Sequence, residues 1–417
     1  MEHVIGLKCV LCGGEYRPDE VLYVCPRHGD EGILDVIYDY DLVRRRMTRE
    51  SLAANHDLSI WRYKPLLPVE PGSTVPPLNV GWTPLYPAHR LGEHLGLLDL
   101  WVKDDGRNPS ASLKDRASVV GIVKAQELGR DLIVAASTGN AAASLACLSA
   151  SVGMRNVIFV PQSAPQAKIA QLLVFGATVV AVRGSYDQAF DLSLAATGEY
   201  GWYSRNTAYN PYLSEGKKTA ALEICEQLAW CAPDRIFVSV GDGCIIGGLG
   251  KGLRDLLALG FIEKLPKLVG VQAEGSSVLF EAWRRGSEEI RPVPPTTLAD
   301  SIASEVPRDR IKALRAVRDT DGEFVAVSDQ EILDAMQLLG RTTGVFGEPA
   351  GAAPLAGLLK MQRQERVEPA ERIVVLVTGN GLKDVGSAVK AAGGPHVIAP
   401  TEEALHRAVD ELNLVAG

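Results

Sequence analysis

From about residue 100 onward, short apolar runs alternate with longer segments of helical character. The runs are rich in Val and Ile and little interrupted by polar residues, which predicts strands buried on both faces of parallel sheets. There are too many of them for one sheet, so the pattern predicts two α/β lobes, with ligands bound at the carboxyl ends of strands. Strands are predicted at LDLWVKD, DLIVAAS, NVIFVP, ATVVAV, RIFVSV, LVGVQA and RIVVLVTG, and helices from Leu113, from Asn140, from Ala164, over Tyr186–Ala196 and after RIFVSV.

Two stretches before residue 100 depart from this alternation. Residues 1–35 are typical of a small ribbon with two metal-ligand pairs, Cys9-x-x-Cys12 and Cys25-x-x-His28, each beside glycine. Such pairs suit a tetrahedral zinc ion with no open position, so a structural zinc is expected, with a metal-free hairpin as the alternative. The proline-rich run from Lys64 to Pro77 disfavours an uninterrupted helix or central strand and predicts a surface arm.

Composition narrows the class of protein. A chain of 417 residues exceeds the roughly 250–300 at which single cores stop growing, which predicts two or three structural units. The net charge of −8 argues against nonspecific nucleic-acid binding, because a phosphate backbone needs a basic face. No signal-peptide pattern or membrane-length apolar run is present, and the odd count of seven cysteines argues against a disulfide framework. A cytoplasmic location is therefore expected.

Lys114 is the first candidate for chemistry. It lies in Asn108-Pro-Ser-Ala-Ser-Leu-Lys-Asp-Arg, after the strand Leu100–Lys103 and at the start of a helix. The positive end of the helix dipole and shielding from water both disfavour an ammonium ion, which leaves the neutral amine that imine chemistry requires. Taken alone, a lysine at a helix start is more often simply solvated.

Three further motifs follow predicted strands. Ser137-Thr-Gly-Asn140 places hydroxyls and free N–H groups at a helix N-terminus, which suits a carboxylate, although an ordinary N-cap explains one hydroxyl. The glycine-rich run from Gly241 to Gly250 can cradle a phosphate but fits neither the dinucleotide nor the Walker pattern, and a tight structural turn is the alternative. Thr378 ends the last strand and can partner a ring nitrogen, or merely satisfy loop backbone groups.

Together these motifs resemble those of the fold type II pyridoxal-phosphate enzymes, and of the threonine synthase family most closely. They run in the family's order and spacing, strongly from about residue 80 and loosely from residue 9. The resemblance implies a cofactor in the cleft between a large domain, residues 36–112 and 215–417, and a small domain, residues 113–214, beside the ribbon. The matching segments are Asn108–Arg116, Ser137–Asn140, Asn210-Pro-Tyr, Glu215-Gly-Lys-Lys-Thr, Gly344-Val-Phe-Gly-Glu-Pro-Ala and Thr378–Asp384.

The resemblance also implies the role of each residue. Lys114 would carry pyridoxal 5'-phosphate as a Schiff base and shuttle protons, Asn140 would bind the ring hydroxyl, and Thr378 would bind the pyridine nitrogen. The implied reaction, in a homodimer, turns the small amino-acid substrate O-phosphohomoserine and water into threonine and phosphate by γ-elimination and β-addition. The cofactor phosphate would contact Gly241, Asp242, Gly243, Cys244 and Ile245, and the substrate carboxylate would contact Ser137, Thr138 and Gly139.

Two residues depart from the family's pattern. Leu213 stands where threonine synthases have an arginine that helps to bind the substrate phosphate, and Ile245 replaces an asparagine that serves the substrate. Because leucine cannot offer a charge-assisted contact, either another cation (Lys217, Arg205 or Arg183) substitutes or the substrate differs.

Two alternative functions remain open. One is a related β- or γ-replacement or elimination enzyme, resembling cysteate synthase acting on phosphoserine or a serine/threonine deaminase. The other is a zinc-ribbon binding protein with an inactive enzyme fold. The joint presence of Lys114, Asn140 and Thr378 argues against the second alternative.

Overall fold

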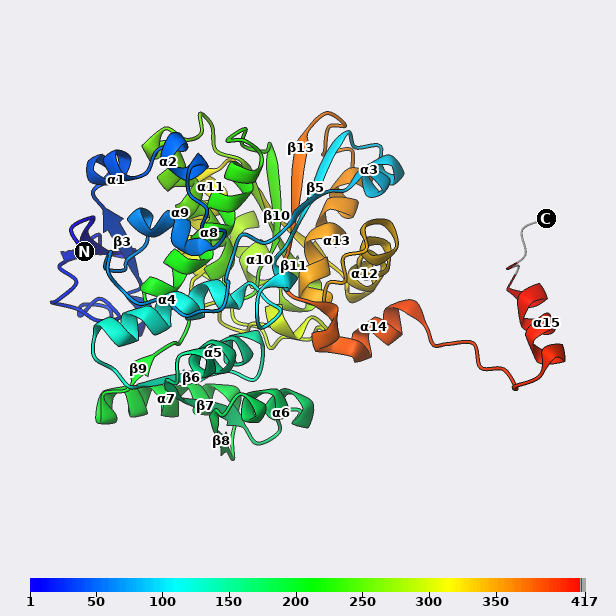
Figure 1. Ribbon diagram of the computed structural model, residues 1–417, viewed down its shortest axis with the longest axis horizontal. Helices are drawn as coiled ribbons and strands as arrows, with labels where there is room; N and C mark the ends of the chain where they lie inside the picture. Colours follow the sequence, from blue (N-terminus) through cyan, green and yellow to red (C-terminus); the bar gives the residue numbers. More distant parts are fainter. Residues whose placement is uncertain (413, 415–417) are drawn as a thin grey trace.

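A six-stranded sheet in the order β12-β11-β10-β13-β5-β4 forms the larger of two α/β lobes in the computed structural model, which describes residues 1–412 and 414 (Figure 1). All neighbouring strands are parallel except the β4–β5 pair. Apart from its first residue, β13 is buried throughout, as its unbroken apolar run predicts. The strands are β4 (Leu85–Pro87), β5 (Asp99–Asp104), β10 (Arg235–Ser239), β11 (Lys267–Ala273), β12 (Glu323–Val327) and β13 (Arg372–Val377).

A four-stranded parallel sheet in the order β8-β7-β6-β9 forms the smaller lobe. Its strands and the helices between them all lie within residues 113–214, and domain limits at those two residues stay a prediction. The strands are β6 (Leu132–Ala136), β7 (Arg155–Pro161), β8 (Thr178–Val182) and β9 (Tyr203–Ser204), and the helices are α5 (Asn140–Ser151), α6 (Gln166–Val174) and α7 (Tyr186–Tyr200). The prediction of two parallel-sheet lobes is confirmed.

Helix boundaries follow local signals. The predicted start at Asn140 is confirmed, and the start predicted at Leu113 is off by one residue. Helix α7 continues past Ala196 to Tyr200 and ends where Gly201 adopts a left-handed conformation (φ 67°). The other helices are α1 (Tyr40–Arg46), α2 (Arg49–Ala53), α3 (His89–Leu95), α4 (Lys114–Glu127), α8 (Tyr212–Gln227), α9 (Cys244–Leu259), α10 (Val278–Arg284), α11 (Arg310–Asp319), α12 (Asp329–Thr343), α13 (Pro349–Arg363), α14 (Val385–Ala392) and α15 (Glu402–Glu411).

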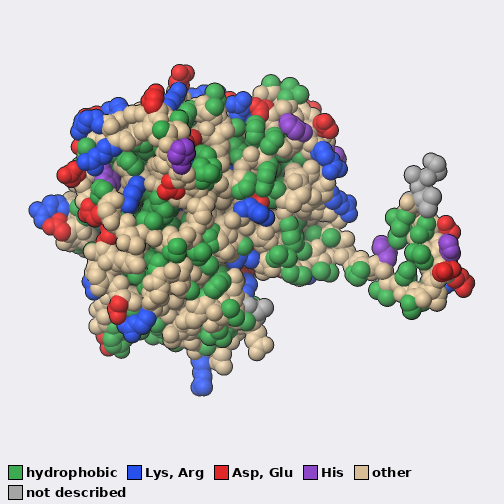
Figure 2. All heavy atoms as spheres, viewed as in Figure 1, with side chains coloured by type: hydrophobic (Ala, Val, Ile, Leu, Met, Phe, Trp, Pro, Cys, Tyr) green, Lys and Arg blue, Asp and Glu red, His purple; other side chains and the backbone are tan. Residues whose placement is uncertain are grey.

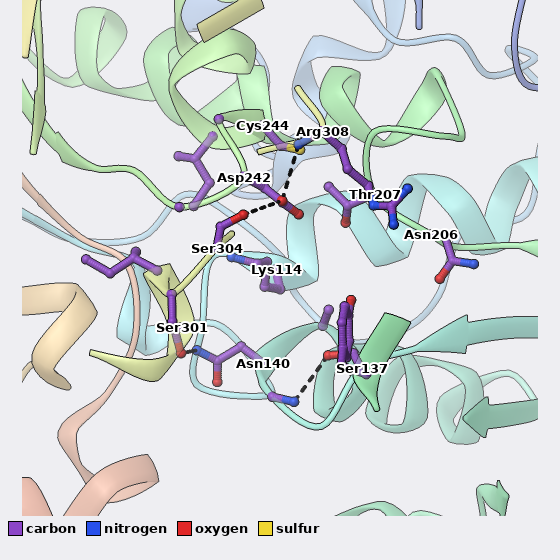
Figure 3. Close-up of a pocket in the computed structure, with 18 of the residues that line it drawn as sticks. Lys114, Ser137, Asn140, Asn206, Thr207, Asp242, Cys244, Ser301, Ser304 and Arg308 are labelled. Atoms are coloured by element: carbon purple, nitrogen blue, oxygen red, sulfur yellow. Dashed lines mark hydrogen bonds between the residues drawn. The ribbon is translucent and has the colours of Figure 1, made fainter. Parts of the chain in front are cut away.

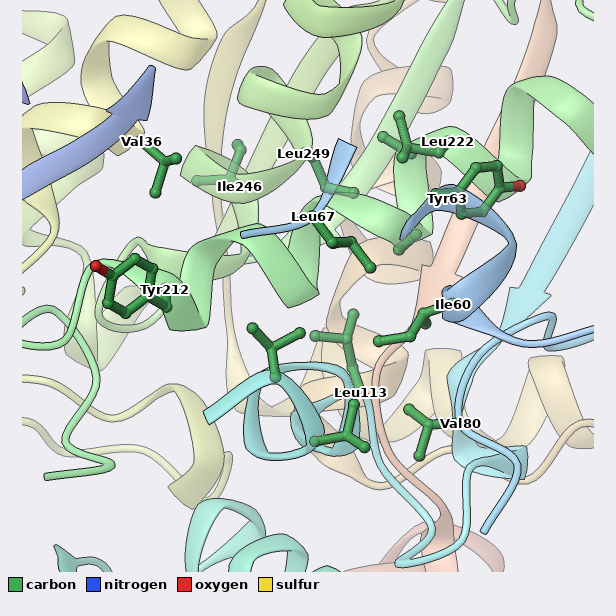
Figure 4. Packing of buried hydrophobic residues seen from close by; sticks show 14 of the residues in the cluster. Val36, Ile60, Tyr63, Leu67, Val80, Leu113, Tyr212, Leu222, Ile246 and Leu249 are labelled. Carbon is green, nitrogen blue, oxygen red and sulfur yellow. The ribbon is translucent and has the colours of Figure 1, made fainter. Parts of the chain in front are cut away.

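The N-terminal ribbon is a three-stranded antiparallel sheet that belongs to the main core. It comprises β1 (Val4–Cys9), β2 (Glu15–Tyr16) and β3 (Leu34–Tyr38), so its last strand extends beyond residue 35. Val36 of β3 is buried in the same cluster as Ile246 and Leu249 of α9 (Figure 4). Tyr38 of β3 donates its hydroxyl to Glu215 of α8 (2.7 Å), and its ring centre lies 5.3 Å from Lys251 Nζ of α9, so the ribbon packs directly on helices of the large lobe.

The prediction of a surface arm from Lys64 is wrong for its first half. Residues Ile60–Leu66 form a short 3-10 helix, and Leu67 and Val69 are fully buried. Proline removes backbone donors but does not prevent apolar neighbours from packing, so this irregular segment contributes to the core (Figure 4).

The surface carries charges of both signs. On the face shown in Figure 2, Lys and Arg side chains are interspersed with Asp and Glu, and α15 stands clear of the main body. Within the described residues, no helix is both long enough and apolar enough to span a membrane.

Helices α4 and α8 approach so closely that only glycine fits at Gly216. A Cβ atom there would lie 1.9 Å from the carbonyl oxygen of Arg116. This contact brings the helix that begins with Lys114 against the helix that carries the Glu215-Gly-Lys-Lys motif.

Gly216→Ala should destabilise the protein by about 1–3 kcal/mol or more, because backbone must move to admit the methyl group. Gly198→Ala is the matched control: Gly198 is an exposed glycine of α7 with nothing within 4 Å of the added carbon. There the same substitution should stabilise the helix by roughly 0.5–1 kcal/mol. Thermal unfolding of both variants measures the difference, and equal melting temperatures would contradict the packing described here.

Candidate active site

A cavity of about 650 Å³ lies between the two lobes, and every residue that the sequence assigns to the cofactor or the substrate lines it. It is lined at the strand ends by Lys114, Ser137, Thr138, Gly139, Asn140, Gly241, Asp242, Gly243, Cys244, Ile245 and Thr378. Figure 3 shows Lys114 between the Ser137–Asn140 loop of the small lobe and Asp242 and Cys244 of the large lobe. Four motifs that are far apart in the sequence thus share one cleft.

Backbone pairing sets Lys114 beside Thr378. The N–H of Leu113 donates to the carbonyl of Thr378 (2.9 Å), and the N–H of Asn380 donates to the carbonyl of Ala111 (3.0 Å). These bonds tie the loop before α4 to the loop after β13. Lys114 is consequently the first residue of its helix and points into the cavity (Figure 3).

A buried ion network holds the start of α4. The Arg116 guanidinium pairs with Asp105 (2.7 Å) and Glu223 (2.5 Å), and all three side chains are inaccessible to solvent. Lys103 adds a second cation to Glu223 (2.7 Å). Since every charge in this network has an opposite partner, the network can be buried without the cost of an isolated charge.

The glycine-rich loop forms an open helix N-terminus. Gly243 precedes α9 in the left-handed region (φ 91°), and no side chain caps the helix. A Cβ on Gly241 would lie 2.8 Å from the Cα of Ile302, and one on Gly243 would lie 2.8 Å from the Ala313 side chain. The glycines therefore let the loop pack closely against Ile302 and Ala313, and the uncapped first N–H groups of α9 at the cavity suit a phosphate.

The small lobe offers a second anion site at the start of α5. No side chain caps this helix, and the Ser137 hydroxyl accepts a hydrogen bond from the N–H of Gly139 (3.1 Å). Asn140 donates its amide to Ser301 (3.4 Å; Figure 3) and to buried Glu348 (2.7 Å), which both belong to the large lobe. Asn140 thus bridges the two walls of the cavity.

The environment of Lys114 favours a neutral amine. Burial first, and then the charge of Lys217, lower the pKa of Lys114 from 10.5 to about 8, against the opposing effect of Glu348. Arg205 lowers it further. Burial also raises the pKa of Glu348. The neutral amine is the form that can attack a carbonyl and accept a proton.

The cavity fits pyridoxal phosphate. It combines a lysine with a lowered pKa, an uncapped helix N-terminus that suits a phosphate, and a hydroxyl at Thr378, 3.3 Å from that of Ser239. The sequence model described as "Pyridoxal-phosphate dependent enzyme" matches residues 77–379. Threonine synthase of Methanocaldococcus jannaschii is 39% identical over 97% of this chain and 99% of its own length. The chain belongs to the threonine synthase family of pyridoxal-phosphate-dependent enzymes.

A second relative and a solved structure agree with this membership. Threonine synthase of Methanosarcina acetivorans is also 39% identical, over 97% of this chain and 98% of its own length. The processed form of threonine deaminase isoform 2 from Solanum lycopersicum superimposes with a TM-score of 0.64 and 22% identity, covering 75% of this chain and 83% of that one. This last similarity shows the fold.

The three cations that could replace the family arginine differ in their position relative to the cavity. Arg205 and Lys217 line the cavity, whereas Arg183 is exposed and lies outside its lining. Leu213 is buried and does not line the cavity; its side chain lies beside Gly121 of α4. Ile245 does reach the cavity.

Several lining residues were not singled out from the sequence. Glu348 belongs to a segment that matches the family, but its buried bond to Asn140 follows only from the fold. The stretch 300–308 supplies Ser301, Ser304 and Arg308 without any recognisable motif. The Ser304 hydroxyl donates to the Asp242 carboxylate (3.3 Å), so this stretch helps to hold the glycine-rich loop that precedes α9 (Figure 3).

The ribbon cysteines and histidine form a separate cluster. The possible ligand atoms of Cys9, Cys12, Cys25 and His28 all lie within 4.8 Å of one another. The Cys12–Cys25 sulfurs are 3.9 Å apart, and Cys25 Sγ is 3.5 Å from His28 Nδ1. A tetrahedron with metal–sulfur bonds of about 2.3 Å has edges near these lengths.

In the cofactor-free enzyme, Lys114 should react with acetic anhydride with a pH midpoint near 8, because its pKa is lowered to about 8. In denaturant the pKa of the same lysine should return to about 10.4, the ordinary value for lysine. Mass spectrometry of the Lys114 peptide after competitive labelling gives both midpoints. Identical midpoints in the folded and unfolded chains would contradict the electrostatics described here.

Proposed function

We propose that this protein is a threonine synthase that converts O-phosphohomoserine and water into threonine and inorganic phosphate. The convergence of Lys114, Asn140, the α9 N-terminus and Thr378 in one cavity carries this proposal. Relatives with 39% identity over nearly the full length support the same reaction.

Each group has a distinct task. When bound, pyridoxal phosphate supplies the electron sink that stabilises negative charge next to the substrate's amino group. The N–H groups at the start of α9, from Cys244 and Ile245, would hold the cofactor phosphate. Gly241 and Gly243 allow the loop that carries them to pack closely against Ile302 and Ala313. Asn140 would bind the ring hydroxyl through its amide, and Thr378 would bind the ring nitrogen through its hydroxyl.

Lys114 holds and moves the proton. Its lowered pKa keeps a useful share of the side chain neutral near pH 8, so its Nζ can take a proton from the substrate carbon and later return it. The Ser137–Gly139 loop, at the positive end of α5, binds the substrate carboxylate. Together these contacts fix both ends of an amino acid relative to the proton-transferring amine.

Lys114→Ala should lower threonine formation from O-phosphohomoserine roughly 10²- to 10⁴-fold or more, since it removes both the attachment and the proton carrier. Its visible cofactor absorbance should also disappear, while the far-ultraviolet circular dichroism should be unchanged. Lys390→Ala, on exposed α14, controls for the loss of a lysine.

The same assay separates the alternatives. Release of a 2-oxo acid from serine or threonine would favour a deaminase, and consumption of O-phosphoserine with sulfite would favour a cysteate synthase-like reaction. Wild-type enzyme that forms no threonine from O-phosphohomoserine would refute the proposed reaction.

The ribbon cluster binds one structural zinc ion in this proposal. The four ligands of Cys9, Cys12, Cys25 and His28 leave no open position, so the metal stabilises the ribbon and takes no part in catalysis. The ribbon contacts α9 through Tyr38 and Lys251, so a metal that stabilises the ribbon also stabilises the position of the helix proposed to bind the cofactor phosphate. The homodimer and the cytoplasmic location stay predictions from the sequence.

Cys25→Ser should lower the zinc content from one equivalent per chain and reduce the melting temperature, because metal-binding free energy contributes to folding. Cys231→Ser, an exposed cysteine outside the cluster, should change neither. Elemental analysis and calorimetry measure both effects. Equal metal content in the two variants would contradict this site.

A further inference from the structure

Two cations that line the cavity are buried without an ion-pair partner among the described residues. The Lys217 side chain on α8 is completely inaccessible, and its Nζ has no hydrogen-bond partner among the described residues. Arg205, 1% exposed, uses Nε on Ser118 (3.0 Å) and Nη1 on Thr207 (2.9 Å), and its Nη2 has no partner within the described part of the chain. Both residues line the cavity.

Other deeply buried cations nearby are paired. Arg116 and Lys103 share Glu223, and Lys218, the neighbour of Lys217 in the sequence, pairs with Glu215 (2.6 Å) and Asp255 (2.7 Å). An unpaired buried charge is strongly unfavourable. Asp309 and Asp242 act electrostatically on Lys217, but neither forms an ion pair with it, so Lys217 and Arg205 can each still bind an anion.

The other anions of the proposed reaction already have binding groups. The cofactor phosphate has the α9 N-terminus, and the substrate carboxylate has the α5 N-terminus. The remaining anion is the phosphate ester of the substrate, whose charge near neutral pH matches two cations.

We propose that Lys217 and Arg205 form the subsite for the substrate's phosphate group, with the Thr207 hydroxyl beside them. This inference rests on the proposed function and deepens it. The pair serves in place of an arginine at position 213, where Leu213 lies outside the cavity lining. Both cations also act on Lys114, since each lowers the pKa of its amine. A bound phosphate therefore neutralises charge that acts on the catalytic lysine.

Binding of inorganic phosphate to the holoenzyme tests the subsite. Phosphate at roughly a hundred times its dissociation constant should raise the wild-type melting temperature by a few degrees. Lys217→Met and Arg205→Met should abolish this increase. Without phosphate, each variant should melt at or above the wild-type temperature, because an unpaired buried charge has been removed. A purely structural role would lower it.

Kinetics supply the second measurement. Either substitution should lower kcat/KM for O-phosphohomoserine at least about tenfold, as expected for loss of a buried charge-assisted contact. Arg183→Met is the matched control, because this exposed cation lies outside the cavity lining, and it should leave kcat/KM and phosphate binding unchanged.

Two results would overturn the inference. One is loss of the visible cofactor absorbance in Lys217→Met and Arg205→Met, which would assign the pair to the cofactor phosphate. The other is unchanged phosphate binding in the double variant. If wild-type enzyme makes no threonine while its phosphate binding depends on the pair, the subsite is supported for another phosphate ester and the proposed reaction fails.

Discussion

Two buried cations, Lys217 and Arg205, line the cavity without an ion-pair partner among the described residues, and the electrostatics of the active site depend on them. The N-termini of α4, α5 and α9 lie at the cavity, which Lys114 and the two buried cations Lys217 and Arg205 also line. Each unit of charge there costs free energy until an anion arrives. The site is consequently built for ligands that carry several negative charges, and part of their binding energy relieves repulsion that exists in the empty protein.

The helix that begins with Lys114 is held by buried charges that balance one another. Arg116, Asp105, Glu223 and Lys103 form a closed network at the base of α4, and backbone bonds from Leu113 and Asn380 tie α4 to β13. These contacts fix the helix start independently of any ligand. The pKa of Lys114 is thus lowered by fixed neighbours rather than by mobile ones, which is the kind of preorganisation that catalysis requires.

Much of this could be predicted from the sequence, for identifiable reasons. Unbroken apolar runs predicted both parallel sheets, and short motifs after strands predicted Lys114, Asn140, Gly243 and Thr378, because such motifs must meet at strand ends. The β12 strand and the stretch 300–308 were not predicted: the first resembles ordinary amphipathic sequence, and the second acquires its position only from tertiary packing. The burial of Leu67 and Val69 was not predicted. The prolines around them limit backbone hydrogen bonding, but they do not determine whether neighbouring apolar side chains are buried.

Contacts around the cavity mouth join three parts of the chain. Lys168 of α6 pairs with Asp300 across the cleft, the Arg308 guanidinium lies 3.9 Å from the centre of the Phe190 ring, and Glu31 of the ribbon pairs with Arg310. The Asp300 and Glu31 carboxylates are more than half exposed, so their ion pairs contribute only about 0–1 kcal/mol each. Breaking them to admit a substrate therefore costs little, whereas the fully buried network beneath α4 would cost far more to disturb. Changes in the contacts at the rim therefore cost less free energy than changes in the buried network that fixes the helix beginning with Lys114.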